Sequence, residues 1–184
     1  ADLKLDGLAV TLRYEKGLLV QAATRGDGFI GEDVTQNVKT IEAIPLKLRL
    51  HDVAPAWRQR VLETAVEIRG EIVMLKKDFV ALNKRQAKLG QPEFANPRNV
   101  AAGSIRQLDP QATASRNLAF MGYAEIGINT ETHEQEHEII KDLGLPVNKF
   151  NKFCPDLNCV FETWKKWAKM RLQLPYQIDG MVVI

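Results

Sequence analysis

A short connection between two strand-like segments constrains the fold of this chain more than any other feature. Val10, Leu12 and Tyr14 alternate with polar neighbours in residues 7–14, and residues 18–24 form a second apolar segment. This alternation is typical of a β-strand with one buried face. The connection at residues 15–17 is short and ends in a glycine, which favours antiparallel neighbours. The sequence therefore predicts a β-hairpin near the amino terminus.

Further strands and helices predict the fold class. Apolar patterns and turn residues place strands at residues 46–50, 65–75, 117–128 and 176–184, and helices at residues 34–38, 77–89, from 97 onward, at 131–143 and at 161–170. The polar residues 51–63 are expected to form a surface insertion, and the aromatic side chains of residues 161–170 a packing stripe. Hairpin strands with helices between them predict an α+β fold with mainly antiparallel sheets.

Length, charge and composition favour one domain without an extended polyanion-binding surface. The chain has 184 residues, 45% of them hydrophobic, and can bury a sizeable core. Its 25 Lys and Arg residues nearly balance its 23 Asp and Glu residues, so any polyanion site must be local. The sequence shows no signal peptide and no apolar run long enough to span a membrane. We therefore expect a cytoplasmic protein that makes no membrane contact.

The cysteine and histidine residues do not predict a metal site. Cys154 and Cys159 are the two cysteines, and two stray thiols are typical of a reducing compartment. His133 and His137 lie four residues apart in an acidic helical segment, and no third ligand is visible in the sequence around them. We expect both histidines to lie on a solvent-exposed helix face.

A lysine beside the first strand is the candidate nucleophile. Lys4 has Asp2 two residues before it, Asp6 two residues after it and Gly7 behind it. Lys4 and Asp6 have the same strand parity, and Gly7 allows a ligand to approach the backbone closely. A lysine attacks only after its amine loses its proton, which a pocket wall can favour. A solvated lysine beside a turn would have the same four-residue pattern.

Three arginines are candidates for anion binding. Arg25 begins a loop with three glycines within six residues, which is either an ordinary turn or a phosphate-binding or carboxylate-binding loop. Arg98 and Arg106 lie eight residues apart on a helix that begins with an Asn96 cap and Pro97. The two side chains can therefore share one face, which either contacts a polyanion or faces solvent.

Glu71 lies within the strongest predicted strand. An unpaired carboxylate is costly to bury. We expect Glu71 to face a cavity or ligand, or to pair with Arg69 or Lys4; the alternative is an edge-strand charge that faces solvent.

Five motifs together resemble one protein family. They are KLDG at residues 4–7, ATRGDG at 23–28, RGE at 69–71, ANPRNVAAGS at 95–104 and IDGMVV at 178–183. Their order and approximate spacing resemble the adenylation domain of bacterial NAD-dependent DNA ligases over almost the whole chain. ATP-dependent ligases and capping enzymes share the lysine, glutamate and Asp-Gly motifs, whereas the Asn-Pro-Arg-Asn stretch resembles only the NAD-dependent class. The resemblance implies a nucleotidyltransferase (ATP-grasp-like ligase) fold.

The resemblance implies that Lys4 attacks the α-phosphorus of NAD, releases nicotinamide mononucleotide and retains AMP. The AMP is then passed to the 5′-phosphate of a DNA nick, which is sealed during replication or repair. Mg²⁺ would accompany the substrate. The other implied site residues contact the adenine, ribose, phosphates or DNA. They are Asp2 at the adenine amino group, Leu5 along the adenine, Tyr123 stacked on it, Val182 as an apolar wall, Arg25 near ribose and phosphate, Glu71 at the ribose or metal, and Arg98 and Arg106 at the cofactor or nicked DNA.

Two positions depart from the family pattern. Asp2 stands where the family carries glutamate, and Ile184 stands five residues after Asp179, where the family places a phosphate-contacting lysine. Either the strand register differs by one residue and the lysine lies just past residue 184, or the lysine is absent. Residues 1–184 are expected to be an excised domain, without the nicotinamide-mononucleotide-binding, oligonucleotide-binding, zinc and helix-hairpin-helix parts of a complete ligase. The expected partners are NAD and nicked double-stranded DNA, and the expected state is a monomer. The alternative function is a catalytically weak paralogue that binds nucleotide or nicked DNA without sealing it.

Overall fold

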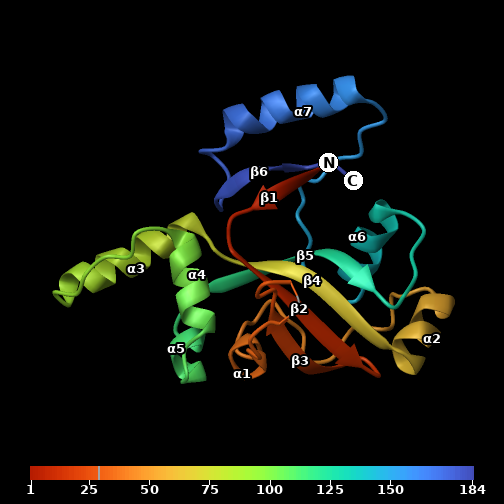
Figure 1. Cartoon of the computed structure of the whole chain (residues 1–184), viewed down its shortest axis with the longest axis horizontal. Helices are drawn as coiled ribbons and strands as arrows, with labels where there is room; N and C mark the ends of the chain where they lie inside the picture. Colours follow the sequence, from red (N-terminus) through yellow and green to blue (C-terminus); the bar gives the residue numbers. More distant parts are fainter. Residues whose placement is uncertain (29) are drawn as a thin grey trace.

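Two antiparallel sheets organise the protein. The computed structural model describes residues 1–28 and 30–184; Phe29, in the predicted glycine-rich loop, lies outside the described residues. The larger sheet has the strand order β3 (Leu18–Thr24), β2 (Leu8–Glu15), β4 (Ala65–Met74) and β5 (Leu118–Ile126). The smaller sheet pairs β1 (Asp2–Leu5) with β6 (Ile178–Val182) and lies beside the larger one (Figure 1). Every named strand pair is antiparallel, as predicted.

The predicted hairpin is present and very tight. Glu15 pairs with Leu18, so Lys16 and Gly17 form the connection. Their φ angles are 50° and 76°, the left-handed values that a two-residue type I′ turn requires at both positions. This turn matches the twist of the flanking strands and fixes β2 against β3.

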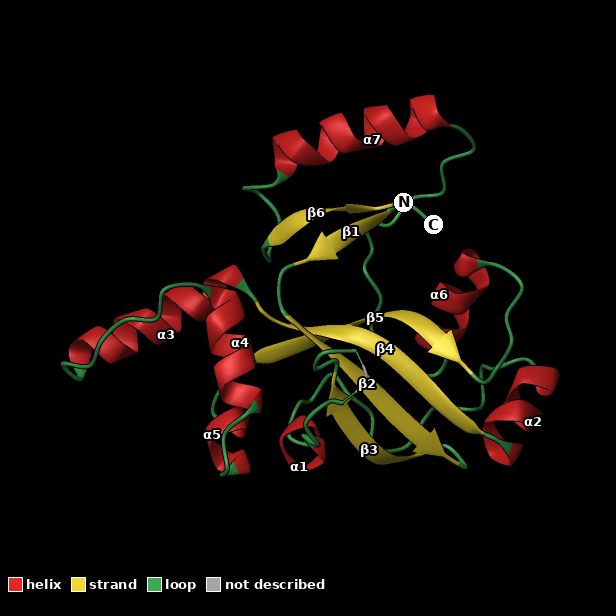
Figure 2. Cartoon of the chain, viewed as in Figure 1, coloured by secondary structure: helices red, strands yellow, loops and turns green. Residues whose placement is uncertain are grey.

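The smaller sheet joins segments from opposite parts of the sequence. Lys4 lies opposite Gly180, and α7 (Leu157–Met170) packs on the face turned away from the larger sheet (Figure 2). Trp167 is buried there with Leu3 and Ile178. The predicted aromatic stripe is wrong in its amino-terminal half, because Phe161 and Trp164 remain 59% and 54% exposed. The buried cluster includes the carboxyl-terminal part of the helix and leaves these two rings outside.

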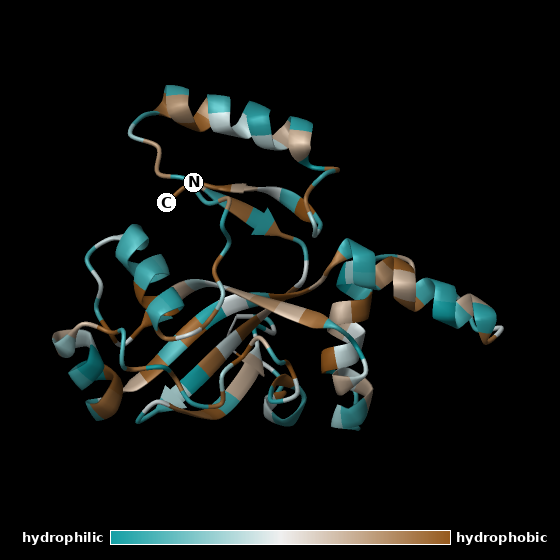
Figure 3. Cartoon of the chain, turned by 180° about the vertical axis from the view of Figure 1, so that it is seen from behind, coloured by the Kyte–Doolittle hydropathy of each residue, from teal (hydrophilic) through white to brown (hydrophobic). Residues whose placement is uncertain are grey.

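The described part of the chain has six more helices. They are α1 (Thr35–Val38), α2 (Pro55–Glu63), α3 (Lys76–Lys88), α4 (Pro97–Ile105), α5 (Pro110–Ala114) and α6 (His133–Asp142). Apolar residues gather along the strands, whereas α6 is mostly hydrophilic (Figure 3). The amino end of α4 is capped as predicted, because Asn96 Oδ1 accepts a hydrogen bond from Asn99 N at 2.7 Å. Among the described residues, no helix combines the length and apolarity that a membrane crossing requires.

The structure adds to one prediction between residues 46 and 63 and contradicts another. The predicted strand at residues 46–50 is a single bridge, Leu18 to Lys47, because the backbone bonds of this segment go to Gly17 and Leu19 at the hairpin and to Leu143 after α6. The predicted surface insertion is mostly exposed, but it contains α2, which begins at Pro55 and buries Val61 completely. Pro55 suits the first helical position, and Val61 and the partly buried Trp57 attach this mostly polar helix to the core.

Gly7 has a packing role that its motif did not indicate. A Cβ atom at Gly7 would lie 2.2 Å from the carbonyl oxygen of Ile72 on β4. The absent side chain therefore admits a strand of the protein itself, and the predicted close approach of a ligand to Gly7 stays a prediction. This close contact fixes the segment after Lys4 against the strand that carries Glu71.

We expect Gly7→Ala to lower the free energy of unfolding by about 1–3 kcal/mol, because the backbone at Ile72 must move to accept the methyl group. Urea denaturation measures the change. Gly103→Ala is the matched control, since a Cβ atom there meets open space in α4 and alanine favours helix by up to about 1 kcal/mol. Equal stability of the Gly7→Ala and unchanged proteins would contradict the packing role.

Candidate active site

One cavity of about 970 Å³ opens between the two sheets. Its walls come from both strands of the smaller sheet, from β2, β4 and β5, from α4 and α6, and from the loop after β3. All nine site residues that the sequence predicted line it: Asp2, Lys4, Leu5, Arg25, Glu71, Arg98, Arg106, Tyr123 and Val182. The fold thus brings together side chains that lie up to 180 positions apart in the sequence.

Lys4 is held at the cavity wall by an ion pair. Its Nζ atom lies 2.5 Å from Asp179 Oδ2, and the lysine side chain is 54% exposed. Gly180 lies directly opposite Lys4, and a Cβ atom there would make only ordinary van der Waals contact with the lysine stem. A lysine ammonium has no lone pair, so Lys4 becomes a nucleophile only once a proton has been removed.

Glu71 faces the cavity from an inner strand, so the edge-strand alternative is wrong. Burial raises the pKa of Glu71 to about 7, although a hydrogen bond from the Gly7 backbone and the charges of Arg98 and Lys4 oppose the rise. A carboxyl group that titrates near neutrality in a cavity is a candidate functional group.

This raised pKa predicts a pH-dependent stability. The folded protein holds the Glu71 proton more tightly than the unfolded chain, whose pKa is near 4.5. Compared with Glu71→Gln, the unchanged protein should therefore lose on the order of 3 kcal/mol of unfolding free energy between pH of about 4.5 and 7. Urea denaturation at several pH values measures this difference, with Glu67→Gln on the same strand as control. A difference that does not vary with pH would contradict the shift.

The three arginines line the cavity and two of them already contact carboxylates. Arg98 Nη1 lies 3.0 Å from Asp6 Oδ1, and Arg106 Nε lies 3.8 Å from Glu32 Oε2. Both arginine side chains are more than half exposed, so an anion can reach them. Arg25 begins the glycine-rich loop.

The glycines after Arg25 let the loop fold back on itself. A Cβ atom at Gly26 would meet Ile30 O, and one at Gly31 would meet Thr24 O. At these two positions the absent side chains admit the loop's own backbone, and the predicted approach of a ligand to the loop stays a prediction. The result is a compact loop that carries Arg25 to the cavity rim.

An aromatic ring and an apolar side chain form part of the remaining wall. Tyr123 on β5 is 36% exposed, and its burial together with Glu71 raises the pKa of its hydroxyl despite Arg25 and Arg69. Val182 lies opposite Asp2 in the smaller sheet. A planar base can stack on a ring of this kind.

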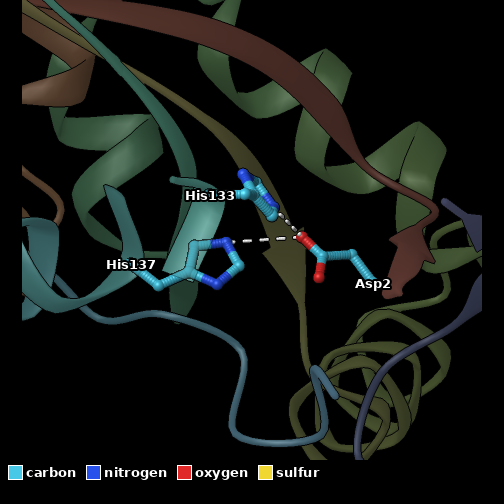
Figure 4. Close-up of side chains that lie close together, drawn as sticks. All are labelled: Asp2, His133 and His137. Atoms are coloured by element: carbon cyan, nitrogen blue, oxygen red, sulfur yellow. Dashed lines mark hydrogen bonds and ion pairs between the residues drawn. The ribbon is translucent and has the colours of Figure 1, made fainter. Parts of the chain in front are cut away.

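Asp2 is buried and contacts two histidines through one oxygen (Figure 4). Its Oδ2 atom lies 2.8 Å from His133 Nε2 and 3.3 Å from His137 Nε2. The prediction that both histidines face solvent is wrong, because their side chains are only 20% and 16% exposed. The sequence could not show this, since Asp2 lies 131 residues before His133 and the two meet only in the folded chain.

The Asp2 carboxylate and the imidazole of His133 stabilise each other's charged forms. Burial pushes the pKa of Asp2 upward, but hydrogen bonds and charge attraction from His137 and His133 lower it overall. Burial lowers the pKa of His133, but Asp2 and Glu136 outweigh it and raise the value. His133 and Glu136 also line the cavity, and sequence reasoning missed both. Their only sequence signal was a pair of histidines on one face of an amphipathic helix.

Comparisons with known proteins agree with the motifs. A family model described as the NAD-dependent DNA ligase adenylation domain matches residues 1–184. The chain is 46% identical to a DNA ligase of Syntrophomonas wolfei, over 100% of this chain and 26% of that protein. It is 49% identical to a DNA ligase of Desulforamulus reducens and 50% identical to one of Neisseria meningitidis serogroup C, over 99% and 98% of this chain and 26% and 21% of those proteins. The chain therefore spans about a quarter of the length of these relatives.

Proposed function

Because this chain belongs to the family of NAD-dependent DNA ligase adenylation domains, we propose that it transfers adenylate from NAD to its own Lys4. The lysine nitrogen forms a bond to the α-phosphorus, the bond from that phosphorus to the bridging oxygen breaks, and nicotinamide mononucleotide leaves. Lys4 must first give up a proton, and the Asp179 carboxylate 2.5 Å away is the acceptor in contact with it. One observation carries this proposal: all nine residues assigned from the motifs line a single cavity.

Different parts of the cavity wall contact the adenine, the ribose and the phosphates of the nucleotide. Asp2 contacts both histidines through Oδ2, so its Oδ1 atom is left to accept the adenine amino group. Leu5, Tyr123 and Val182 supply apolar surface for the base. Arg25, Arg98 and Arg106 offer positive charge to phosphates or DNA, and Glu71 contacts the ribose or a substrate-bound Mg²⁺. Ile184 also lines the cavity, near the position at which the family places a phosphate-contacting lysine.

We further propose that the chain has the nucleotidyltransferase fold and acts within a longer DNA ligase. There the adenylate passes to the 5′-phosphate of nicked double-stranded DNA, which is sealed in replication or repair. Parts outside residues 1–184 would hold the nicotinamide end and encircle the DNA. The protein would be a cytoplasmic monomer.

Incubation with NAD or with ATP, each with Mg²⁺, tests this proposal. We expect mass spectrometry to find one adenylate on the chain with NAD and none with ATP, and nicked DNA to discharge the adduct. The assay is run on the chain alone and on the chain joined to the flanking parts of a DNA ligase relative. Labelling by ATP alone would contradict the proposed cofactor. Tight AMP binding without labelling in either form would favour a nucleotide-binding paralogue.

A further inference from the structure

Three metal-binding side chains converge at the edge of the cavity. Asp2 comes from β1, and His133 and His137 come from successive turns of α6. Their ligand atoms all lie within 4.8 Å of one another, and both imidazoles point to the same carboxylate oxygen (Figure 4). The three side chains are largely buried, so the fold holds them in place before any ligand arrives.

We propose that Asp2, His133 and His137 form a binding site for a divalent transition-metal ion of the zinc type. Two imidazoles and one carboxylate are a donor set that zinc uses in three-ligand sites with a free fourth position. Bonds of about 2.0–2.1 Å in a tetrahedron separate the ligand atoms by about 3.3–3.5 Å. The observed contacts of 2.8 Å and 3.3 Å need only small side-chain movements to reach this spacing. Mg²⁺ prefers six oxygen ligands and does not match these donors.

A carboxylate beside His133 also favours a zinc-type ion at this site. Glu136 Oε2 lies 2.5 Å from Nδ1 of His133, while Nε2 of that ring points to Asp2. Histidines that bind zinc commonly donate their other ring nitrogen to a carboxylate, which fixes the ring and strengthens it as a ligand. Glu136 therefore stands where a zinc site has its supporting carboxylate.

The position of the site gives the ion a consequence for nucleotide binding, which rests on the proposed function. Asp2 belongs both to this cluster and to the proposed adenine subsite. An ion on Oδ2 withdraws electron density from the carboxylate and restricts its rotation, so Oδ1 accepts the adenine amino group less well. We therefore expect metal and nucleotide to weaken each other's binding.

Metal titration of the whole 184-residue chain tests the site. Every protein in this titration also carries Cys154→Ser and Cys159→Ser, because the two free thiols would otherwise compete for the ion. We expect calorimetry with ZnCl₂ to show one site, and Co²⁺ to give the visible absorption of a low-coordinate ion without a thiolate charge-transfer band. His137→Gln should weaken Zn²⁺ binding at least about 10-fold, and Glu136→Gln about 10-fold to 100-fold.

The chain offers a matched control for the histidine substitution. His51 Nε2 lies 2.9 Å from Asp52 Oδ2 on the surface, so His51→Gln also removes one histidine from a carboxylate pair. It should leave Zn²⁺ affinity unchanged. If circular dichroism shows that His137→Gln does not fold, the Zn²⁺ affinity of Glu136→Gln tests the site instead. Equal Zn²⁺ affinity in the unchanged protein, the foldable cluster variants and His51→Gln would overturn the proposed site.

Titration with AMP in the presence and absence of Zn²⁺ tests the coupling separately. We expect Zn²⁺ to weaken AMP binding in the unchanged protein and to have less effect in Glu136→Gln. Zn²⁺ binding without any change in AMP affinity would overturn the coupling. Failure of the chain to bind AMP at all, with the Zn²⁺ site intact, would instead contradict the proposed nucleotide function.

Discussion

Lys4→Ala should abolish the covalent adenylate that NAD forms on the protein. The proposed reaction needs an amine at the cavity wall, and alanine has no nucleophilic atom there. The fold should survive, because the Lys4 side chain is half exposed and forms an ion pair with Asp179 at the cavity wall rather than a core contact. Mass spectrometry of the intact protein, followed by peptide mapping, measures the adduct in the chain and in its extended form.

A second lysine provides the control for this result. Lys165 on α7 pairs with Glu162 at 2.8 Å and is exposed to a similar degree, but it does not line the cavity. Lys165→Ala should therefore form the adduct at the normal rate. An adenylate on the Lys4→Ala protein, mapped to any other residue, would show that Lys4 is not the acceptor.

Glu71→Ala should slow adenylation by a factor on the order of 10². The carboxylate lies in the cavity and interacts electrostatically with Arg98 and Lys4, so its loss changes the charge around the reacting phosphate. Single-turnover rates with NAD give the effect on the chemical step. Glu67→Ala is the control on the same strand, since Glu67 lies outside the cavity lining. Equal rates for the two variants would make Glu71 a structural charge.

Local features of the fold were the most predictable ones. The hairpin follows from a short glycine-containing connection, and α4 follows from an asparagine cap and a proline at its first turn. Both depend on residues within a few positions of one another. Residues 46–50 show the limit of such reasoning, because their alternating pattern is that of a strand but their hydrogen-bond partners are set by the distant end of the hairpin.

The sequence predicted which residues would meet in one cavity, but not which of them would contact one another. Motif resemblance assigned nine residues, and all of them line the cavity. It could not assign the ion pair of Lys4 with Asp179, nor the two histidines on Asp2, because each contact joins residues that are more than 120 positions apart. Such contacts depend on how β1, β6 and α6 pack, and side-chain periodicity carries no information about that.

The pairing of β1 with β6 has a consequence for protein synthesis. Residues 178–182 leave the ribosome long after residues 2–5. Among the described residues, they form the strand that pairs with β1. The larger sheet can form first, because its strands lie between residues 8 and 126 and domains fold as their segments emerge. Contacts between such distant residues form slowly, since the intervening chain must first be ordered. A nascent chain therefore carries Lys4 on an unpaired strand until β6 emerges, and it acquires the Lys4–Asp179 arrangement only as the last described strand is added.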